Sequence, residues 1–116
     1  MNLRAELDPF ARLLDLAATQ HRVIASNIAN ASTPGWKRRE LDFDAALRAA
    51  LEGGDSSHPS VRIDEESPVG PDGNSVQLER ELVDLSKNTL LYQTLVRSTL
   101  SKTSMLRAAI LGRGGV

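Results

Sequence analysis

The sequence contains no cysteine among its 116 residues, and only 3% of the residues are aromatic. The lack of cysteine excludes disulfides and thiolate metal sites, and it leaves the redox compartment undetermined. Aromatic rings are scarce for a small independent domain, whose core commonly rests on several of them. The apolar residues are instead mainly Leu, Ala, Ile and Val, a composition typical of helices.

A strong charge of one sign and a long apolar run are also missing. The net charge is -1, so no overall field attracts nucleic acid or an anionic membrane. No apolar run approaches the ~20 residues that a membrane-spanning helix needs. Residues 1–8 include Arg4, Glu6 and Asp8, which is not the pattern of a secretory signal peptide. We therefore expect any export from the cytoplasm to proceed without a cleaved signal.

Motifs for catalysis or for cofactor binding are absent from the sequence. Neither a nucleophile elbow nor a phosphate loop occurs. His21 falls on an apolar helical stripe, where a packed histidine is the simpler interpretation, and His58 stands alone in a loop before Pro59. A zinc site needs three or four converging ligands. The sequence therefore predicts no enzyme, no cofactor, no metal and no small-molecule substrate.

Two charged runs stand out against this background. The acidic run 64–66 lacks the spacing and the glycine of a calcium loop, and we interpret it as solvated surface. The basic run Lys37, Arg38 and Arg39 has no interleaved aromatic beyond Trp36, so no nucleic-acid partner is predicted. The role of the basic run stays open at this stage.

Composition divides the chain into four segments of one domain. Segment 1–31 has helical periodicity, with apolar residues spaced alternately four and three apart. Asp8 as N-cap and Pro9 at the first position predict a helix over about 9–31. This stripe consists of Leu3, Leu7, Phe10, Leu14, Ala17, His21, Ile24 and Ile28.

Segment 75–111 repeats the four-three spacing, and segment 112–116 is a glycine-rich tail. Asn74 as N-cap, with Gln77 in the capping-box position, predicts a helix over 76–110 that ends at Gly112. Its stripe consists of Leu78, Leu82, Leu85, Thr89, Tyr92, Val96, Thr99, Thr103, Leu106 and Ile110.

Segment 32–74 holds all but one of the prolines and most of the glycines. Residues 43–51 predict a short amphipathic helix that ends at Gly53 and Gly54. Residues 55–73 are interpreted as a loop, in which 61–63 is at most a brief extended segment.

The predicted fold is mainly α, with the long terminal helices paired as an antiparallel coiled-coil-like hairpin and an irregular middle segment. The last helix is too apolar for one partner, because it also carries Leu90, Leu95 and Leu100 outside its stripe. The remaining apolar surface must be shared between subunits, unless the middle segment folds back into a three-helix domain. The expected packing positions are Leu14, Ile24, Ile28, Leu85, Tyr92, Val96 and Leu106.

The segment 26–37 (SNIANASTPGWK) predicts the end of the first helix and the turn that follows it. Pro34 and Gly35 fit the centre of a type II turn, in which glycine takes the positive φ. Thr33 before proline is driven toward an extended conformation. Asn27 and Asn30 lie on one helical face, where they can bind freed backbone groups, and Trp36 offers an apolar anchor.

The same segment resembles the N-terminal signature of the bacterial flagellar rod and hook family, roughly Asn-Ile-Ala-Asn-x-x-Thr-Pro-Gly-aromatic-Lys. Residues 72–81, 88–93 and 104–110 also resemble the second half of the proximal rod members of that family. The resemblance implies a structural subunit of the basal-body rod, located in the periplasm around the export channel. Its implied partners are copies of itself, other rod proteins, the inner ring and the export apparatus. The alternative from another class is a soluble helical adaptor that binds one partner through its apolar face.

Overall fold

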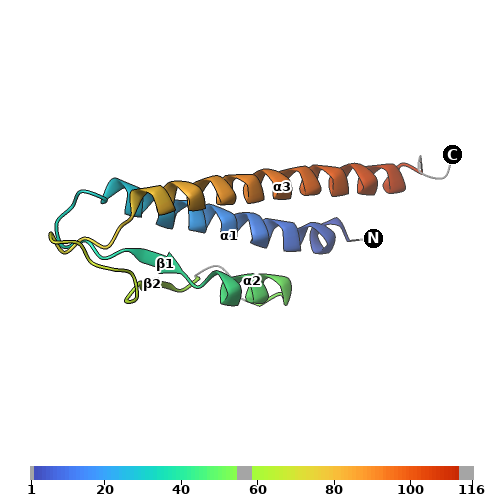
Figure 1. Ribbon diagram of the computed structural model, residues 1–116. Coiled ribbons are helices and arrows are strands. Elements are labelled where there is room, and N and C mark those ends of the chain that lie inside the picture. The colour runs from blue at the N-terminus through green and yellow to red at the C-terminus, as the bar shows by residue number, and fades with distance from the viewer. Residues whose placement is uncertain (1, 55–58, 113–116) are drawn as a thin grey trace.

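The computed structural model describes residues 2–54 and 59–112, and it is elongated, with extents of 67 × 25 × 16 Å. Two long helices, α1 (Leu3–Ala29) and α3 (Leu78–Ile110), run side by side in opposite directions (Figure 1). Between them the chain forms β1 (Arg39–Leu41), α2 (Phe43–Leu51) and β2 (Val61–Ile63). The predicted fold class, a mainly α chain with paired terminal helices, is confirmed.

Helix α1 begins earlier than its proline predicts. The side chain of Asn2 accepts hydrogen bonds from the backbone N–H of Arg4 at 3.1 Å and of Ala5 at 3.3 Å, so it caps the helix. Pro9 therefore lies inside α1, where its ring removes one backbone donor. The predicted start at residue 9 is wrong, because the one backbone hydrogen bond that Pro9 cannot donate costs less than the capped first turn contributes.

Helix α3 begins later than predicted, and without the predicted cap. Its N-cap residue is Gln77, which makes no side-chain capping bond. The side-chain amide of Asn74 instead donates to the backbone oxygens of Asn30 and Thr33, each at 2.8 Å. The prediction of a capping box at Asn74 is wrong because the N-cap of α3 is Gln77, three residues later, and Asn74 Oδ1 accepts from the Val76 N–H at 2.7 Å within the lead-in loop.

The middle segment folds back on α1, below it in Figure 1. Helix α2 spans the predicted residues, and β1 pairs antiparallel with β2, placing Leu41 opposite Val61. The strand over 39–41 was not predicted. Leu16, Leu41 and Ala46 form a small buried cluster between α1 and this segment. The folding-back alternative is thus right for one side of α1, and it leaves most of α3 uncovered.

We call the line of side chains along which α1 and α3 pack the seam. It differs from the two predicted apolar stripes at every second position. The four-three spacing is kept, but polar residues replace several of the expected apolar ones. On α1 the seam consists of Glu6, Phe10, Leu13, Ala17, Gln20, Ile24 and Asn27, and on α3 of Glu81, Leu85, Asn88, Tyr92 at its exposed edge, Leu95, Thr99, Lys102 and Leu106.

Polar contacts cross this seam at three levels. Near the free ends Lys102 Nζ lies 3.3 Å from Glu6 Oε2. Midway, Asn88 Nδ2 donates to the backbone oxygen of Ala17 at 2.8 Å. At the far end Asn27 Nδ2 lies 3.5 Å from Glu81 Oε2. A displaced register would leave buried polar groups unpaired, so these contacts select one alignment of the two helices.

Candidate assembly surface and its polar junction

The exit turn after α1 docks on the loop that leads into α3. Asn30 Nδ2 donates to the Ser26 backbone oxygen at 2.8 Å and its Oδ1 accepts from Thr33 Oγ1 at 3.1 Å, which closes the helix end. Asn74, from the other loop, reaches the two backbone oxygens of this turn described above. The predicted turn residues therefore build a junction between segments far apart in the sequence.

Two glycines let the backbones of these loops approach each other. Gly35 has φ +76°, the conformation that the turn predicts, and its N–H donates to the Asp72 oxygen at 2.8 Å. Gly73 has φ +82°, and a Cβ built there would lie 3.2 Å from Gly35 Cα. Pro34 and Thr33 lie exposed beside this contact. The close approach leaves little room for a side chain at Gly73, whereas a Cβ at Gly35 would meet open space and only its positive φ favours glycine.

Asn27 forms the buried centre of the junction, with a fully buried side chain. Its Oδ1 accepts from the Arg39 backbone N–H at 3.0 Å and its Nδ2 donates to the Arg39 oxygen at 2.7 Å. Trp36 Nε1 lies 3.5 Å from the same Oδ1. The side-chain amide of Asn27 therefore holds β1 against α1 with the same pair of backbone hydrogen bonds that a neighbouring strand would make.

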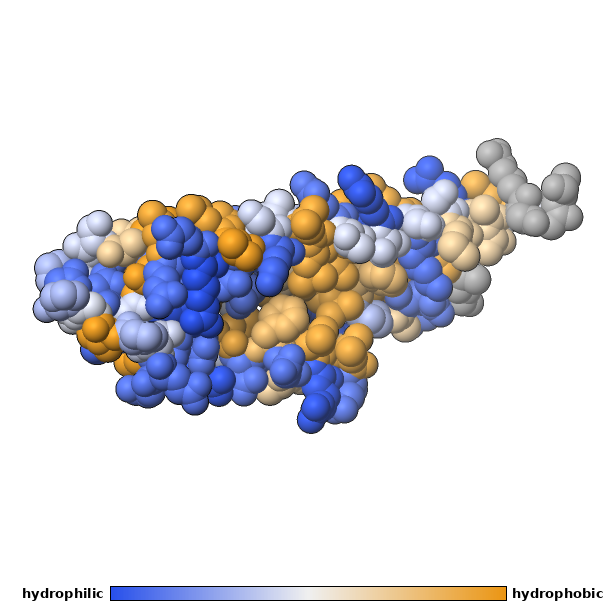
Figure 2. Space-filling model, viewed as in Figure 1, coloured by the Kyte–Doolittle hydropathy of each residue, from blue (hydrophilic) through white to orange (hydrophobic). Residues whose placement is uncertain are grey.

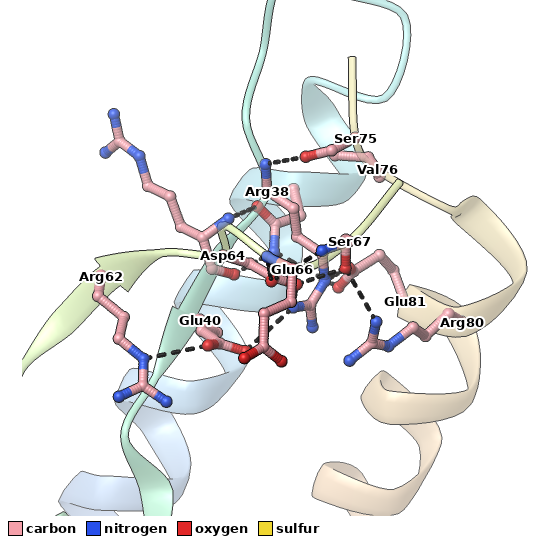
Figure 3. A network of polar contacts seen from close by, with 12 residues as sticks. Arg38, Glu40, Arg62, Asp64, Glu66, Ser67, Ser75, Val76, Arg80 and Glu81 are labelled. Atoms are coloured by element: carbon pink, nitrogen blue, oxygen red, sulfur yellow. Dashed lines mark hydrogen bonds and ion pairs between the residues drawn. The ribbon is translucent and has the colours of Figure 1, made fainter. Parts of the chain in front are cut away.

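Arg38 is the buried centre of a cluster of charges, which we call the Arg38 cluster. It consists of Arg38, Glu40, Asp64, Glu81 and Asp84, and Figure 3 labels the first four of these. Arg38 Nε donates to Glu81 Oε1, and its Nη1 donates to Asp64 Oδ2 at 2.9 Å. The side chains of Arg38, Asp64 and Glu81 are 7%, 6% and 0% exposed. The cluster joins β1, the loop after β2 and the first turns of α3.

The surroundings of Arg38 and Asp64 shift the pKa of each toward its charged form. Hydrogen bonds from the Ser67 hydroxyl, from the backbone N–H of Glu66 and Ser67 and from Arg38 hold the pKa of Asp64 well below its usual range, against the effect of burial. Burial lowers the pKa of Arg38, but its bonds and attractions to Glu81 and Asp64 outweigh this and raise the pKa. The interpretation of the acidic run as solvated surface is therefore wrong for Asp64, although Glu65 and Glu66 are exposed.

The structure also resolves the basic run. Arg38 is buried, whereas Lys37 and Arg39 are exposed, with the Arg39 guanidinium 4.8 Å from the centre of the Trp36 ring. The association of Arg38, Asp64 and Glu81 was not predicted from the sequence. One signal was available, because Glu81 and Asn88 are polar residues spaced by seven within an apolar helix.

The predicted packing residues divide between the seam and an exposed surface beside it. Ile24 and Leu106 are buried, and Leu14, Ile28, Leu85 and Val96 are half-buried, whereas Tyr92 is 43% exposed. The stripe positions outside the seam lie together on the side of the helix pair that faces away from α2. We call this surface the open face. His21 and Thr89 line a groove on it, away from the pocket that Phe43 of α2 lines, and by helical spacing from these two it also includes Leu3, Leu7, Leu14, Ile28, Leu78, Leu82, Val96 and Ile110.

A groove of about 410 Å³ runs along the open face between α1 and α3. Ala17 and Ala18 line it from α1, and Thr89 and Tyr92 line it from α3. His21 also lines the groove and is exposed, so the interpretation of His21 as a packed residue is wrong. A surface-exposed groove with small residues on one wall can receive bulkier side chains of another helix.

Helix α3 carries a second exposed apolar stripe, which we call the back stripe and which consists of Val83, Leu90 and Met105, 53%, 64% and 64% exposed. Figure 2 shows apolar surface over α3 along the upper edge and another apolar area where α2 meets the long helices. Exposed apolar area of this extent on one helix is typical of a protein–protein contact.

None of the helices described in residues 2–54 and 59–112 combines the length and hydropathy needed to cross a bilayer. Within the same ranges no group of three His, Cys, Asp or Glu residues is arranged to hold a metal ion. The isolated His58 and the tail residues 113–116 lie outside the described residues.

Known proteins resemble this chain both in the N-terminal part of the junction and over most of its length. A family model described as flagella basal body rod protein matches residues 14–37, the second half of α1 and the exit turn. A flagellar basal body rod protein FlgB of Cereibacter sphaeroides is 36% identical, over 94% of this chain and 96% of the relative. The FlgB proteins of Aquifex aeolicus, 31% identical over 97% of this chain and 98% of the relative, and of Escherichia coli, 31% identical over 69% and 74%, are also similar.

Proposed function

The chain belongs to the flagellar basal body rod protein FlgB family and is a component of the flagellar basal body rod, and we propose that it polymerises through α1 and α3 into the proximal part of the shaft. The observation that carries this proposal is the apolar surface that the chain leaves uncovered on α3, where Leu90, Leu100 and Met105 are each 64% exposed. Moving a fully exposed leucine or methionine side chain into an apolar environment stabilises by about 1.5–3 kcal/mol. Neighbouring subunits that cover the exposed parts of these three side chains therefore gain free energy of association.

The placement of this surface supports a polymer rather than a closed pair. Residues eighteen apart on a helix point in the same direction after about five turns, so Leu82 and Leu100 belong to one side. Leu90 and Met105, on the back stripe, point to another side of the exposed surface. Two different surfaces on one helix favour contacts with two different neighbours, which is the arrangement that extends into helical filaments.

In this proposal the chain acts by packing alone. The open face receives a helix of one neighbour, and the back stripe contacts a second. The neighbours are copies of this chain and other rod proteins, with the inner ring and the export apparatus at the base. The assembled helices surround the export channel in the periplasm, and the shaft transmits rotation.

Charge substitutions on exposed positions test the proposal without disturbing the fold. Leu100→Asp and Leu90→Asp change one residue of each surface, and both side chains are exposed in the single chain. We expect each variant to keep its helical circular dichroism and to lose rod assembly and swimming. Ser104→Asp is the matched control, because Ser104 lies between the two surfaces and is exposed. Normal swimming of both leucine variants would contradict the proposal.

Two predicted packing residues, Ile28 of the open face and Leu85 of the seam, remain part of this proposal. Ile28→Asp and Leu85→Asp are expected to block assembly as well, but both side chains are half-buried and the variants also weaken the single chain. If the purified chain melts cooperatively as a monomer and never associates, the helical adaptor becomes the better explanation.

A further inference from the structure

We propose that the open face and the back stripe are the two halves of one repeating contact between copies of this chain, in which the back stripe of one copy lies against the α1 edge of the groove of the next. The proposal rests on the proposed function, and it adds the occupant of the open face and the register of the contact. It concerns assembled copies and requires nothing of the unassembled chain.

The α1 edge of the groove alternates small and charged residues. Ala18 and Arg22 line the groove. Ala11 and Asp15 precede them by seven residues, a spacing that returns to nearly the same direction on a helix, within about 20°. Ala11, Asp15 and Arg22 are exposed, and Ala18 is half-buried. This edge therefore offers two shallow apolar positions, each followed by a charge one turn later.

The back stripe carries the complementary order. Val83 and Leu90 are bulky, 53% and 64% exposed, and also seven residues apart. Glu79 lies one turn before Val83 and Lys87 lies one turn after it, and both are exposed. Neither of these charges, and neither charge of the α1 edge, forms an ion pair in the described part of the chain. All four charges are thus available to a neighbouring copy.

Charge selects one register between the two surfaces. Copies that point the same way along a shaft place α3 of one antiparallel to α1 of the next, as within the single chain (Figure 1). When Glu79 lies beside Arg22, Lys87 comes within one residue of the level of Asp15, and both pairs attract. A displacement of seven residues brings Glu79 beside Asp15 in one direction. In the other direction it brings Lys87 beside Arg22, so like charges oppose both alternatives.

The apolar residues agree with this register independently of charge. Val83 then lies at the level of Ala18, and Leu90 lies at the level of Ala11, so each bulky side chain meets a small one. Each copy uses its back stripe on one neighbour and its open face on another. The contact is therefore heterologous and can repeat along a polymer.

Cysteine cross-linking in assembled rods tests the contact, because the natural sequence has no cysteine of its own. A chain with Val83→Cys and Ala18→Cys replaces the natural copy in cells, and swimming shows that rods have formed. A disulfide needs Cβ atoms about 4 Å apart, so it reports the register closely. We expect mild oxidation of isolated basal bodies to give reducible dimers and higher multimers of this chain.

Two further pairs sharpen the cross-linking result. Leu90→Cys with Ala11→Cys samples the same register a second time and should also form multimers. Val83→Cys with Ala25→Cys is the matched control, because Ala25 is exposed but lies seven residues from Ala18, roughly 10 Å along the helix. We expect no multimers from this control pair.

Charge exchange tests the same register without a new disulfide position. Arg22→Glu places like charges together, and we expect the cross-linked fraction of the Val83 and Ala18 cysteine pair to fall about fivefold. Adding Glu79→Arg restores opposite charges in exchanged order and should restore the cross-linked fraction. Arg48→Glu, an exposed change on α2 outside both surfaces, should have no effect.

The proposal is overturned if, in cells that swim, neither pair of the proposed register forms multimers or the Ala25 pair forms them as readily. It is also overturned if Glu79→Arg does not reverse the effect of Arg22→Glu. In these outcomes rods still assemble and another helix fills the open face, so the proposed function stands. The proposed function fails separately, when cells with Leu90→Asp and cells with Leu100→Asp both swim normally.

Discussion

The two ends of the helix pair are held by different kinds of interaction. At the junction end the largest fully buried side chains are polar, namely Glu81, Asn27 and Ser75. At the free end, where both termini lie in Figure 1, Leu3, Met105 and Ile110 are 43%, 64% and 56% exposed, and the charged contact between Glu6 and Lys102 is partly solvated. Directional bonds therefore distinguish the junction end, whereas uncovered apolar surface is present at both ends, since Leu78, Leu82 and Val83 beside Glu81 are 48%, 47% and 53% exposed.

This contrast shows how one chain can be both specific and associative. Hydrogen bonds and buried ion pairs have narrow geometries, so they fix the turn, the hairpin and the helix register at the junction. Apolar burial has no preferred direction and scales with area, so the free end can accommodate neighbours of differing sequence. Substitutions at the junction should therefore reduce the stability of the single chain, and comparable ones at the free end should not.

The largest effect is expected from Asn27→Ala. The change leaves the backbone N–H and oxygen of Arg39 without their partner and removes a contact of Trp36. We expect a loss of about 3 kcal/mol, since buried groups are left unpaired. Urea unfolding followed by circular dichroism measures the loss. A change as small as that of an exposed site such as Gln93→Ala would mean that the amide is dispensable.

Acid should act at the junction through Asp64. Its pKa is lowered in the folded chain, so its contribution is fully present above its unfolded pKa of about 3.9 and is lost as the pH falls further toward the folded value. Asp64→Asn should cost about 2 kcal/mol at pH 7 and flatten the fall in stability between about pH 4 and pH 2. Urea midpoints across this range test the sign, and an unchanged slope in the variant would refute it.

Alanine at two glycines with similar φ compares the ends directly. Gly73→Ala meets both a positive φ of 82° and the backbone of Gly35 at 3.2 Å, and we expect a loss of about 2 kcal/mol. Gly112→Ala, at the end of α3, has φ +70° and open space around it, so about 1 kcal/mol or less is expected. Equal thermal shifts for the two variants would show that the close approach at the junction is unimportant.

The smallest effect is expected at the free end. Glu6→Gln removes the ion pair with Lys102. The side chains of Glu6 and Lys102 are 48% and 35% exposed. Partly solvated ion pairs contribute about 0–1 kcal/mol, so the urea midpoint should hardly move. A loss as large as that for Asn27→Ala would mean that the free end is fixed as tightly as the junction.

Much of this architecture follows from local sequence signals. The four-three spacing of apolar residues requires two long helices, and the residues of α2 and the Pro34-Gly35 turn carry their own local signals. The excess of leucine on α3 predicted exposed apolar surface, which the structure displays at Leu90 and Leu100. The family signature lies in the same contiguous turn.

Which faces meet was decided only by the tertiary structure. Hydrophobicity favoured Leu78 and Leu82 for the seam, yet Glu81 and Asn88 occupy it, because Arg38 and the Ala17 backbone oxygen lie where these polar groups need partners. Likewise, Asn74 does not cap α3: its amide donates to the exit turn, and its Oδ1 accepts from the Val76 N–H before the helix begins. The spacing of apolar residues along a helix is local and can be read from the sequence. The contribution of a buried polar residue to stability depends instead on which partners distant segments place beside it.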